Sequence, residues 1–140
     1  MNDLPIKKLV PEAVLPTRAH HDDAGLDLYG LEAKTILPGA GEMIRTGVAV
    51  AIPEGHVGLV ADRSSLAKRG LKTAGGIIDA GYRGELGVVV RNLGPEPIEL
   101  DHGDRIAQLL IIPIATPAPI EVDELGDTTR GDGGFGSTGR

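Results

Sequence analysis

The sequence predicts an all-β protein, a sandwich or barrel with one short helix. Short apolar runs recur between turn signals at intervals of about ten residues, as in β-sandwiches and barrels. Glycine and proline account for 21 and 10 of the 140 residues, which disfavours long helices. Aromatic residues make up only 2% of the chain, so the core must be built from Val, Ile, Leu and Ala.

Six segments have the length and apolar content of strands. Their ranges are 6–10, 26–29, 43–52, 56–62, 85–92 and 105–112. Side chains of a strand alternate between two faces. In the last segment this predicts that Ile106, Leu110 and Ile112 share a face with the polar Gln108. Pro and Gly pairs such as Pro38-Gly39 separate the segments and predict turns.

Three other segments differ from these strands. Residues 63–70 predict a helix of about two turns, because two serines stand where they can cap it and a glycine ends it. Residues 113–119 contain three prolines and are expected to be extended. Residues 130–140 contain five glycines and too few apolar groups to order the chain alone. We therefore expect a β domain at 1–125 and a flexible arm at 126–140.

Composition and charge exclude several classes of function. Without cysteine, the chain has neither disulfides nor thiolate zinc sites. Its formal net charge of −6 argues against a nucleic-acid partner, which requires a basic surface. No apolar run approaches the roughly 18 residues of a membrane span, and the N-terminus has no signal-peptide pattern. We expect a cytoplasmic protein without a membrane partner.

The segment at residues 75–85 is the first candidate for chemistry. An apolar stretch of the chain ends at Asp79, and a two-residue turn of Ala80 and Gly81 is predicted to follow. Glycines on both sides leave backbone N–H and C=O groups within reach of a planar ligand. The alternative is an ordinary β-turn in which Asp79 is only a turn residue.

Two further candidates are polar groups that suit a phosphate. Arg63, Ser64 and Ser65 bring a guanidinium, two hydroxyls and free backbone N–H groups to the start of the predicted helix. The alternative is a serine N-cap beside a solvated arginine. Gln108 lies among apolar residues, so its amide needs a hydrogen-bond partner, either backbone or ligand. The neighbouring Asp104 and Arg105 can form a structural ion pair.

The arm is the fourth candidate. Phe135 is the only phenylalanine of the chain, and the arm also carries Arg130, Ser137 and Thr138. A ring can stack on a base, while guanidinium, hydroxyl and glycine N–H groups can hold phosphate. The alternative is a terminus without a role.

The order of these segments resembles the five motifs of the trimeric dUTP pyrophosphatase (dUTPase) family. The matching stretches are residues 24–28, 63–67, 76–84, 103–109 and 130–139. The resemblance implies a jelly-roll-like subunit in a homotrimer with shared active sites. It also implies hydrolysis of dUTP to dUMP and pyrophosphate, which limits uracil in DNA and supplies dUMP for thymidylate synthesis.

The resemblance also implies a role for each site residue. Asp79 is the general base that activates water for attack on the α-phosphorus. The phosphates contact Arg63, Ser64, Ser65, Gln108, Arg130, Ser137 and Thr138. Uracil and deoxyribose contact Gly76, Ile78, Asp79, Tyr82 and Phe135. Mg²⁺ is held mainly by the substrate phosphates, with Asp27 acting through water.

The chain departs from the family pattern at two positions. Thr73 stands where relatives often have asparagine, and Gly81 where they often have a second acidic residue. Both departures concern uracil binding rather than the proposed base. Two alternatives stay open: a dCTP deaminase, which shares the fold, and a nucleotide-binding trimer without catalysis.

Overall fold

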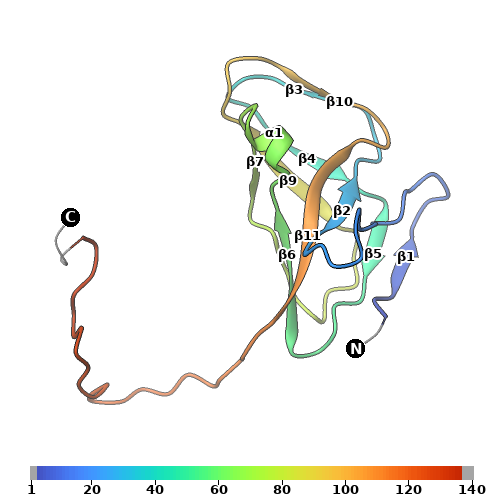
Figure 1. Cartoon of the computed structure of the whole chain (residues 1–140). Coiled ribbons are helices and arrows are strands. Elements are labelled where there is room, and N and C mark those ends of the chain that lie inside the picture. The colour runs from blue at the N-terminus through green and yellow to red at the C-terminus, as the bar shows by residue number, and fades with distance from the viewer. Residues whose placement is uncertain (1–2, 137–140) are drawn as a thin grey trace.

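The protein is an all-β body with one helical turn, as the sequence predicts (Figure 1). The structure is a computed structural model that describes residues 3–136. Its strands are β1 (Ile6–Lys8), β2 (Leu26–Tyr29), β3 (Lys34–Ile36), β4 (Gly41–Arg45), β5 (Val48–Val50), β6 (His56–Ala61), β7 (Leu71–Ala74), β8 (Ile77–Ile78), β9 (Gly87–Asn92), β10 (Ile98–Leu100) and β11 (Arg105–Pro113). Its helix is α1 (Ser64–Ala67). Within the described range, no helix has the length and apolar character to cross a membrane.

Two larger antiparallel sheets form the body. One has the strand order β2-β11-β6-β8 and the other β4-β9-β7. Two further pairs, β1-β5 and β10-β3, flank them. The buried cluster contains Leu28 and Leu109 from the first sheet and Ile44 and Val88 from the second. The apolar faces of the two sheets therefore pack together as in a jelly-roll-like sandwich, and the strands of residues 3–136 form no closed barrel.

The segment 43–52 is two strands rather than the single predicted one. It divides at Gly47, whose φ of +72° lies in the left-handed region that favours glycine. A Cβ at this position would approach the Ala13 Cβ to 2.9 Å. Because the chain turns here, β4 pairs with β9 while β5 pairs with β1 in another sheet.

The start of β11 also differs from the prediction. The register with β2 shifts between Arg105 and Ala107, as in a β-bulge. Ile106 is only 1% exposed and belongs to the core, whereas Leu110 and Ile112 are half-buried. The expectation that these three isoleucine and leucine side chains share one face is wrong, because the irregularity interrupts the period of two.

The helix is shorter than predicted and is not capped by a serine. Arg63 is the N-cap residue, and no side chain forms a capping hydrogen bond. Leu66 is the buried residue of this single turn. The chain leaves it at Gly70, which has a φ of +97° and whose carbonyl accepts a hydrogen bond of 2.8 Å from the N–H of Leu93. This contact directs the chain immediately into β7.

A buried amide connects β9 with its surroundings. The Asn92 side chain is fully buried, and its Nδ2 donates to the carbonyls of Ile36 at 2.9 Å and Glu96 at 2.8 Å. Its Oδ1 accepts from the N–H of Gly94 at 2.9 Å. These bonds fasten the end of β9 to β3 and to the turn that follows.

We predict that Asn92→Leu destabilises the fold. The replacement leaves these buried backbone groups without partners, and each costs about 1–3 kcal/mol. The free energy of unfolding in urea should fall by at least about 2 kcal/mol. Glu99→Gln, at an exposed position of β10, is the control and should leave it unchanged. Equal stability of the two variants would contradict this account of Asn92.

Candidate active site

The central strand β11 brings three sequence motifs together. Gln108 lies opposite Asp27 of β2 on one side and opposite Ala61 of β6 on the other. Directly opposite residues of antiparallel strands present their side chains on the same face. Residues of α1 follow β6 at the same end. A pocket of about 220 Å³ results, lined by Asp27, Arg63, Ser64, Ser65 and Gln108. We call it the arginine pocket.

The Gln108 amide is held in place on two sides. Its Nε2 donates to the carbonyl of Asp62 at 2.7 Å, which confirms the expected hydrogen bond and identifies a backbone acceptor. On the other side lies Gly25, where an added Cβ would stand 2.9 Å from the Cβ of Gln108 and would overlap its Oε1. Gly25 therefore provides the space that the amide occupies.

Asp27 lies between two arginines. The Oδ1 atom is 3.7 Å from the Nε of Arg63, and the Oδ2 atom is 3.7 Å from a terminal nitrogen of Arg105. The Asp27 side chain is 18% exposed. Arg105 thus pairs with Asp27 rather than with Asp104, whose Oδ2 accepts from the N–H of Asp101. Two guanidinium groups against one carboxylate leave the pocket with a local excess of positive charge, which favours an anion.

The sequence analysis did not identify Asp62, the residue directly before Arg63 of the arginine pocket. Its carboxylate accepts hydrogen bonds from the N–H and the Oγ1 of Thr73, both at 2.7 Å, and from the Nζ of Lys72 at 2.9 Å. Burial alone raises the pKa of Asp62, but these three hydrogen bonds outweigh burial and lower it below the ordinary value. The resulting stabilisation is present above the ordinary pKa and is lost as the pH falls through the lowered one.

Asp79 and Tyr82 line a second pocket. It has a volume of about 290 Å³ and is lined by Met43, Ile77, Ile78, Asp79, Tyr82, Glu85 and Gly87. The N–H of Tyr82 donates to the carbonyl of Asp79 at 3.1 Å, which confirms the turn at Ala80 and Gly81. Nothing within residues 3–136 forms a hydrogen bond or ion pair with the Asp79 carboxylate. This carboxylate is therefore available to a ligand.

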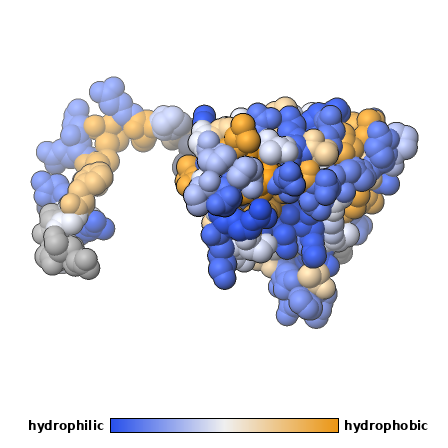
Figure 2. All heavy atoms as spheres, turned by 90° about the horizontal axis from the view of Figure 1, so that it is seen from above, coloured by the Kyte–Doolittle hydropathy of each residue, from blue (hydrophilic) through white to orange (hydrophobic). Residues whose placement is uncertain are grey.

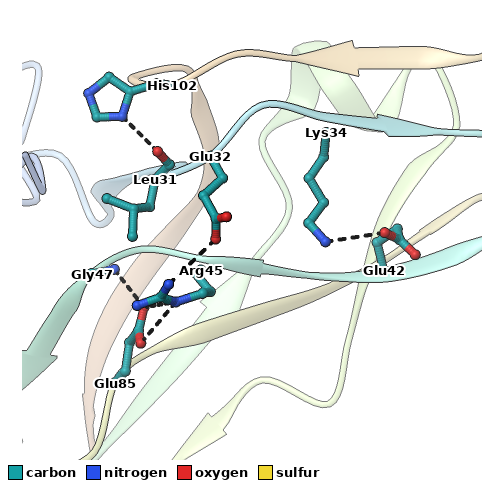
Figure 3. Close-up of polar contacts among 8 residues, drawn as sticks. All are labelled: Leu31, Glu32, Lys34, Glu42, Arg45, Gly47, Glu85 and His102. Carbon is teal, nitrogen blue, oxygen red and sulfur yellow. Dashed lines mark hydrogen bonds and ion pairs between the residues drawn. The ribbon is translucent and has the colours of Figure 1, made fainter.

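The loop after the turn is fixed by Glu85. The carbonyl of Glu85 accepts a hydrogen bond of 2.7 Å from the hydroxyl of Tyr82, and the ring of Tyr82 lies over Gly84. Figure 3 shows the carboxylate of Glu85 against Arg45 and the N–H of Gly47, at distances of 3.1 Å and 2.9 Å. The hydrogen bond and charge of the Glu85 carboxylate raise the pKa of Arg45. Tyr82 is consequently held in one orientation although it is 45% exposed.

The two pockets lie at opposite ends of β6 within one chain. Ile78 pairs with Gly58, so Asp79 continues toward His56 at the start of the strand. Arg63 follows the other end, five residues after Gly58, a separation of roughly 16 Å along an extended strand. Their lining residues do not overlap. Asp79 and the arginine pocket are therefore separate sites within one chain.

The segment after β11 extends away from the body. Residues 114–136 carry no helix or strand, and Figures 1 and 2 show this segment standing apart. Phe135 is fully exposed, with a φ of 50°. Arg130 donates from its Nε to the carbonyl of Gly133. The other two predicted arm residues, Ser137 and Thr138, lie outside the described residues.

Comparison with known proteins decides the family. The family model described as dUTPase matches residues 11–139. The chain belongs to the dUTPase family. This confirms the resemblance that the five motifs predicted and the enzyme class that it implied, a dUTP diphosphatase.

Several relatives match this chain over nearly their whole length. A deoxyuridine 5'-triphosphate nucleotidohydrolase of Corynebacterium jeikeium is 52% identical over 99% of this chain and 95% of its own. The dUTPase of Staphylococcus bacteriophage 80alpha, described with dUPNHPP, superimposes with a TM-score of 0.95 at 35% identity and covers 100% of both chains. A mutant dUTPase of phage phi11 of S. aureus, described as coordinating a structural Mg(II) ion, has a TM-score of 0.83 and 33% identity, over 88% of this chain and 98% of its own.

We predict that Gly25→Ala displaces the Gln108 amide, because the new methyl group overlaps its oxygen. A crystal structure of the variant should show the Nε2 of Gln108 beyond hydrogen-bonding distance of the Asp62 carbonyl. The free energy of unfolding should fall by about 1–3 kcal/mol, as is typical of overpacking.

Gly30→Ala is the matched control for this variant. Its added Cβ would lie at an ordinary 3.5 Å from Ile106 and Ile44. We expect it to leave Gln108 in place. An unmoved amide in Gly25→Ala would refute the role given to Gly25.

Proposed function

We propose that this dUTPase hydrolyses dUTP to dUMP and pyrophosphate, with Asp79 activating the attacking water. The observation that carries the proposal is the arginine pocket, in which residues of three motifs meet around a local excess of positive charge. A triphosphate with about four negative charges matches such a pocket. The phage 80alpha relative described with dUPNHPP supports the substrate.

The phosphates bind in the arginine pocket. The Arg63 guanidinium and the hydroxyls of Ser64 and Ser65 donate hydrogen bonds to phosphate oxygens. Gln108 donates through the hydrogen of its amide that the Asp62 carbonyl leaves free. Arg130, Ser137 and Thr138 of the arm close over the terminal phosphate and exclude bulk water.

Uracil and deoxyribose bind in the second pocket. Backbone groups between Gly76 and Tyr82 read the edge of uracil, with Ile78 beside the ring. Tyr82, held by its bond to the Glu85 carbonyl, packs under the sugar and leaves no room for a 2′-hydroxyl. Phe135 stacks on the base from the opposite side.

The chemical step is an attack of water on the α-phosphorus. Asp79 accepts a proton from the water as its oxygen bonds to phosphorus. The bond from the α-phosphorus to the oxygen that bridges to the β-phosphorus breaks, and pyrophosphate leaves with that electron pair. General-base catalysis of this kind contributes about 10²–10⁴-fold.

The active enzyme is a homotrimer with shared sites. Asp79 and the arginine pocket lie at opposite ends of β6, which supports a site built from several copies. In the arrangement implied by the family resemblance, the first, second and fourth motifs come from one subunit. The third comes from a neighbour and the arm from the remaining subunit. A single subunit is then inactive.

Magnesium is the cofactor in this proposal, and the residues present fit it. Among residues 3–136 no three acidic or histidine side chains form a metal cluster. Mg²⁺ commonly keeps several waters and binds substrate phosphates with one or two carboxylates. Asp27, the carboxylate of the arginine pocket, would hold its water shell. When bound, Mg²⁺ neutralises phosphate charge that would otherwise repel Asp79.

We place the enzyme in the cytoplasm, where its product dUMP supplies thymidylate synthesis and the removal of dUTP limits uracil in DNA. Residues 1–125 act as the β domain and residues 126–140 as the arm. Neither nucleic acid nor membrane is a partner, in keeping with the net charge of −6.

We predict that the full-length enzyme releases pyrophosphate from dUTP in strong preference to dTTP, dCTP and UTP. Asp79→Asn should lower kcat by at least about 10² while nucleotide binding persists, because only the base is lost. Pyrophosphate release with the four nucleotides, and calorimetric binding of dUPNHPP, measure both effects.

Three outcomes would contradict these assignments. Near-normal turnover in Asp79→Asn would exclude Asp79 as the base. Ammonia release from dCTP would favour the deaminase alternative, and binding without turnover of any nucleotide would favour the non-catalytic trimer.

We predict that deletion of residues 128–140 leaves a folded trimer with severely reduced turnover, because the arm no longer closes over the nucleotide. Size-exclusion chromatography with light scattering checks assembly, and pyrophosphate release from dUTP checks activity. Phe135→Ala in the full-length chain separates stacking from the rest of the arm. An unchanged rate after deletion would refute the closing role.

A further inference from the structure

Asp62 connects β7 to the arginine pocket without lining it. Its carboxylate faces β7, where it accepts from the N–H and Oγ1 of Thr73 and from Lys72. Its backbone carbonyl accepts a hydrogen bond of 2.7 Å from the side-chain amide of Gln108. Asp62 is also the residue directly before Arg63, so whatever fixes its backbone fixes the start of the phosphate-binding segment.

The contacts of Asp62 differ from those of an ordinary surface ion pair. Exposed pairs contribute little, since water and salt screen them. The Asp62 side chain is only 24% exposed, and two of its three bonds come from Thr73 rather than from a flexible lysine. Bonds to a charged acceptor are stronger than those between neutral groups. The carboxylate thus holds the residue after β6 in place against β7.

The direction of this carboxylate also matters for anion binding. A negative charge aimed into the arginine pocket would repel a phosphate. The hydrogen bonds to β7 turn it away, and the Lys72 ammonium at 2.9 Å balances its charge. The backbone carbonyl is the only group that Asp62 presents to Gln108.

We infer that Asp62, anchored on Thr73, is a positioning residue that sets the geometry of Gln108 and Arg63 for phosphate binding. The inference deepens the proposed function and rests on it. Asp62 and Thr73 line neither pocket, so they act through the backbone, and the effect of Thr73 falls on phosphate binding rather than on the uracil binding expected from the sequence. Loss of the anchor lets the Asp62 carbonyl and the following arginine shift, which weakens binding of the triphosphate in the ground state and the transition state alike.

The test compares Thr73→Val, Thr73→Ser and Asp62→Asn with the unchanged full-length enzyme. Thr73→Val keeps the shape but removes the hydroxyl donor, so KM for dUTP and the Kd for dUPNHPP should both rise by about tenfold. The kcat should change by less than about twofold, because the lost interaction stabilises the bound substrate and the transition state equally. Thr73→Ser restores the hydroxyl and should restore KM. Asp62→Asn should resemble Thr73→Val.

Matched controls separate positioning from general destabilisation. Thr35→Val in β3 removes an exposed threonine hydroxyl, and Glu99→Gln in β10 removes an exposed carboxylate charge. Neither should change KM. In a Gln108→Ala background, Thr73→Val should raise KM by much less than in the unchanged enzyme, because part of the anchored contact is already gone.

The outcomes distinguish this inference from the proposed function. If the unchanged enzyme does not hydrolyse dUTP, the proposed function fails. If it does, and Thr73→Val and Asp62→Asn keep the original KM and Kd, the positioning role is overturned. A fall in kcat with unchanged KM would also overturn it, as would a full additive effect of Thr73→Val in the Gln108→Ala background.

Discussion

The double pairing of β11 is the constraint on which the site depends. Gln108 has Asp27 on one side and Ala61 on the other, so one strand aligns segments that are far apart in the sequence. A slip of one residue in either pairing would turn Gln108 to the opposite face. Buried neighbours such as Leu109 make that slip costly because it would expose them to water. The aliphatic core thereby sets the position of a polar pocket.

The same sheet explains why one subunit holds two separate half-sites. β6 pairs with β11 along one edge and with the short β8 along the other. The pocket with Asp79 forms at the start of β6 and the arginine pocket after its end. Because strands are stiff and extended, no side-chain rearrangement brings these groups together. This separation is the structural basis for the proposal that several copies of the chain build one site.

The family resemblance grouped distant residues better than local patterns predicted the strands. It assigned Arg63, Ser64, Ser65 and Gln108 to the phosphates and Asp27 to the water shell of Mg²⁺, and these five residues line one pocket. The strands β3, β7, β8 and β10 were missed, since two to four residues are too few to show a readable period. No pattern in the sequence predicted the bulge in β11 either. The role of Asp62 depends on β7, a partner 10 residues or more away that no local pattern identifies.

The charges of the described contacts explain how an acidic chain can bind a polyanion. The net charge is −6, yet at 0.1 M salt charges farther apart than about 10 Å are largely screened, so the local arrangement decides. Within that range Asp27 is paired with Arg63 and Arg105, while Asp62 faces Lys72. The two carboxylates nearest the pocket are thus already matched by cations. Because two guanidinium groups face the single Asp27 carboxylate, the placement of these charges, and not the overall composition, makes the pocket locally positive.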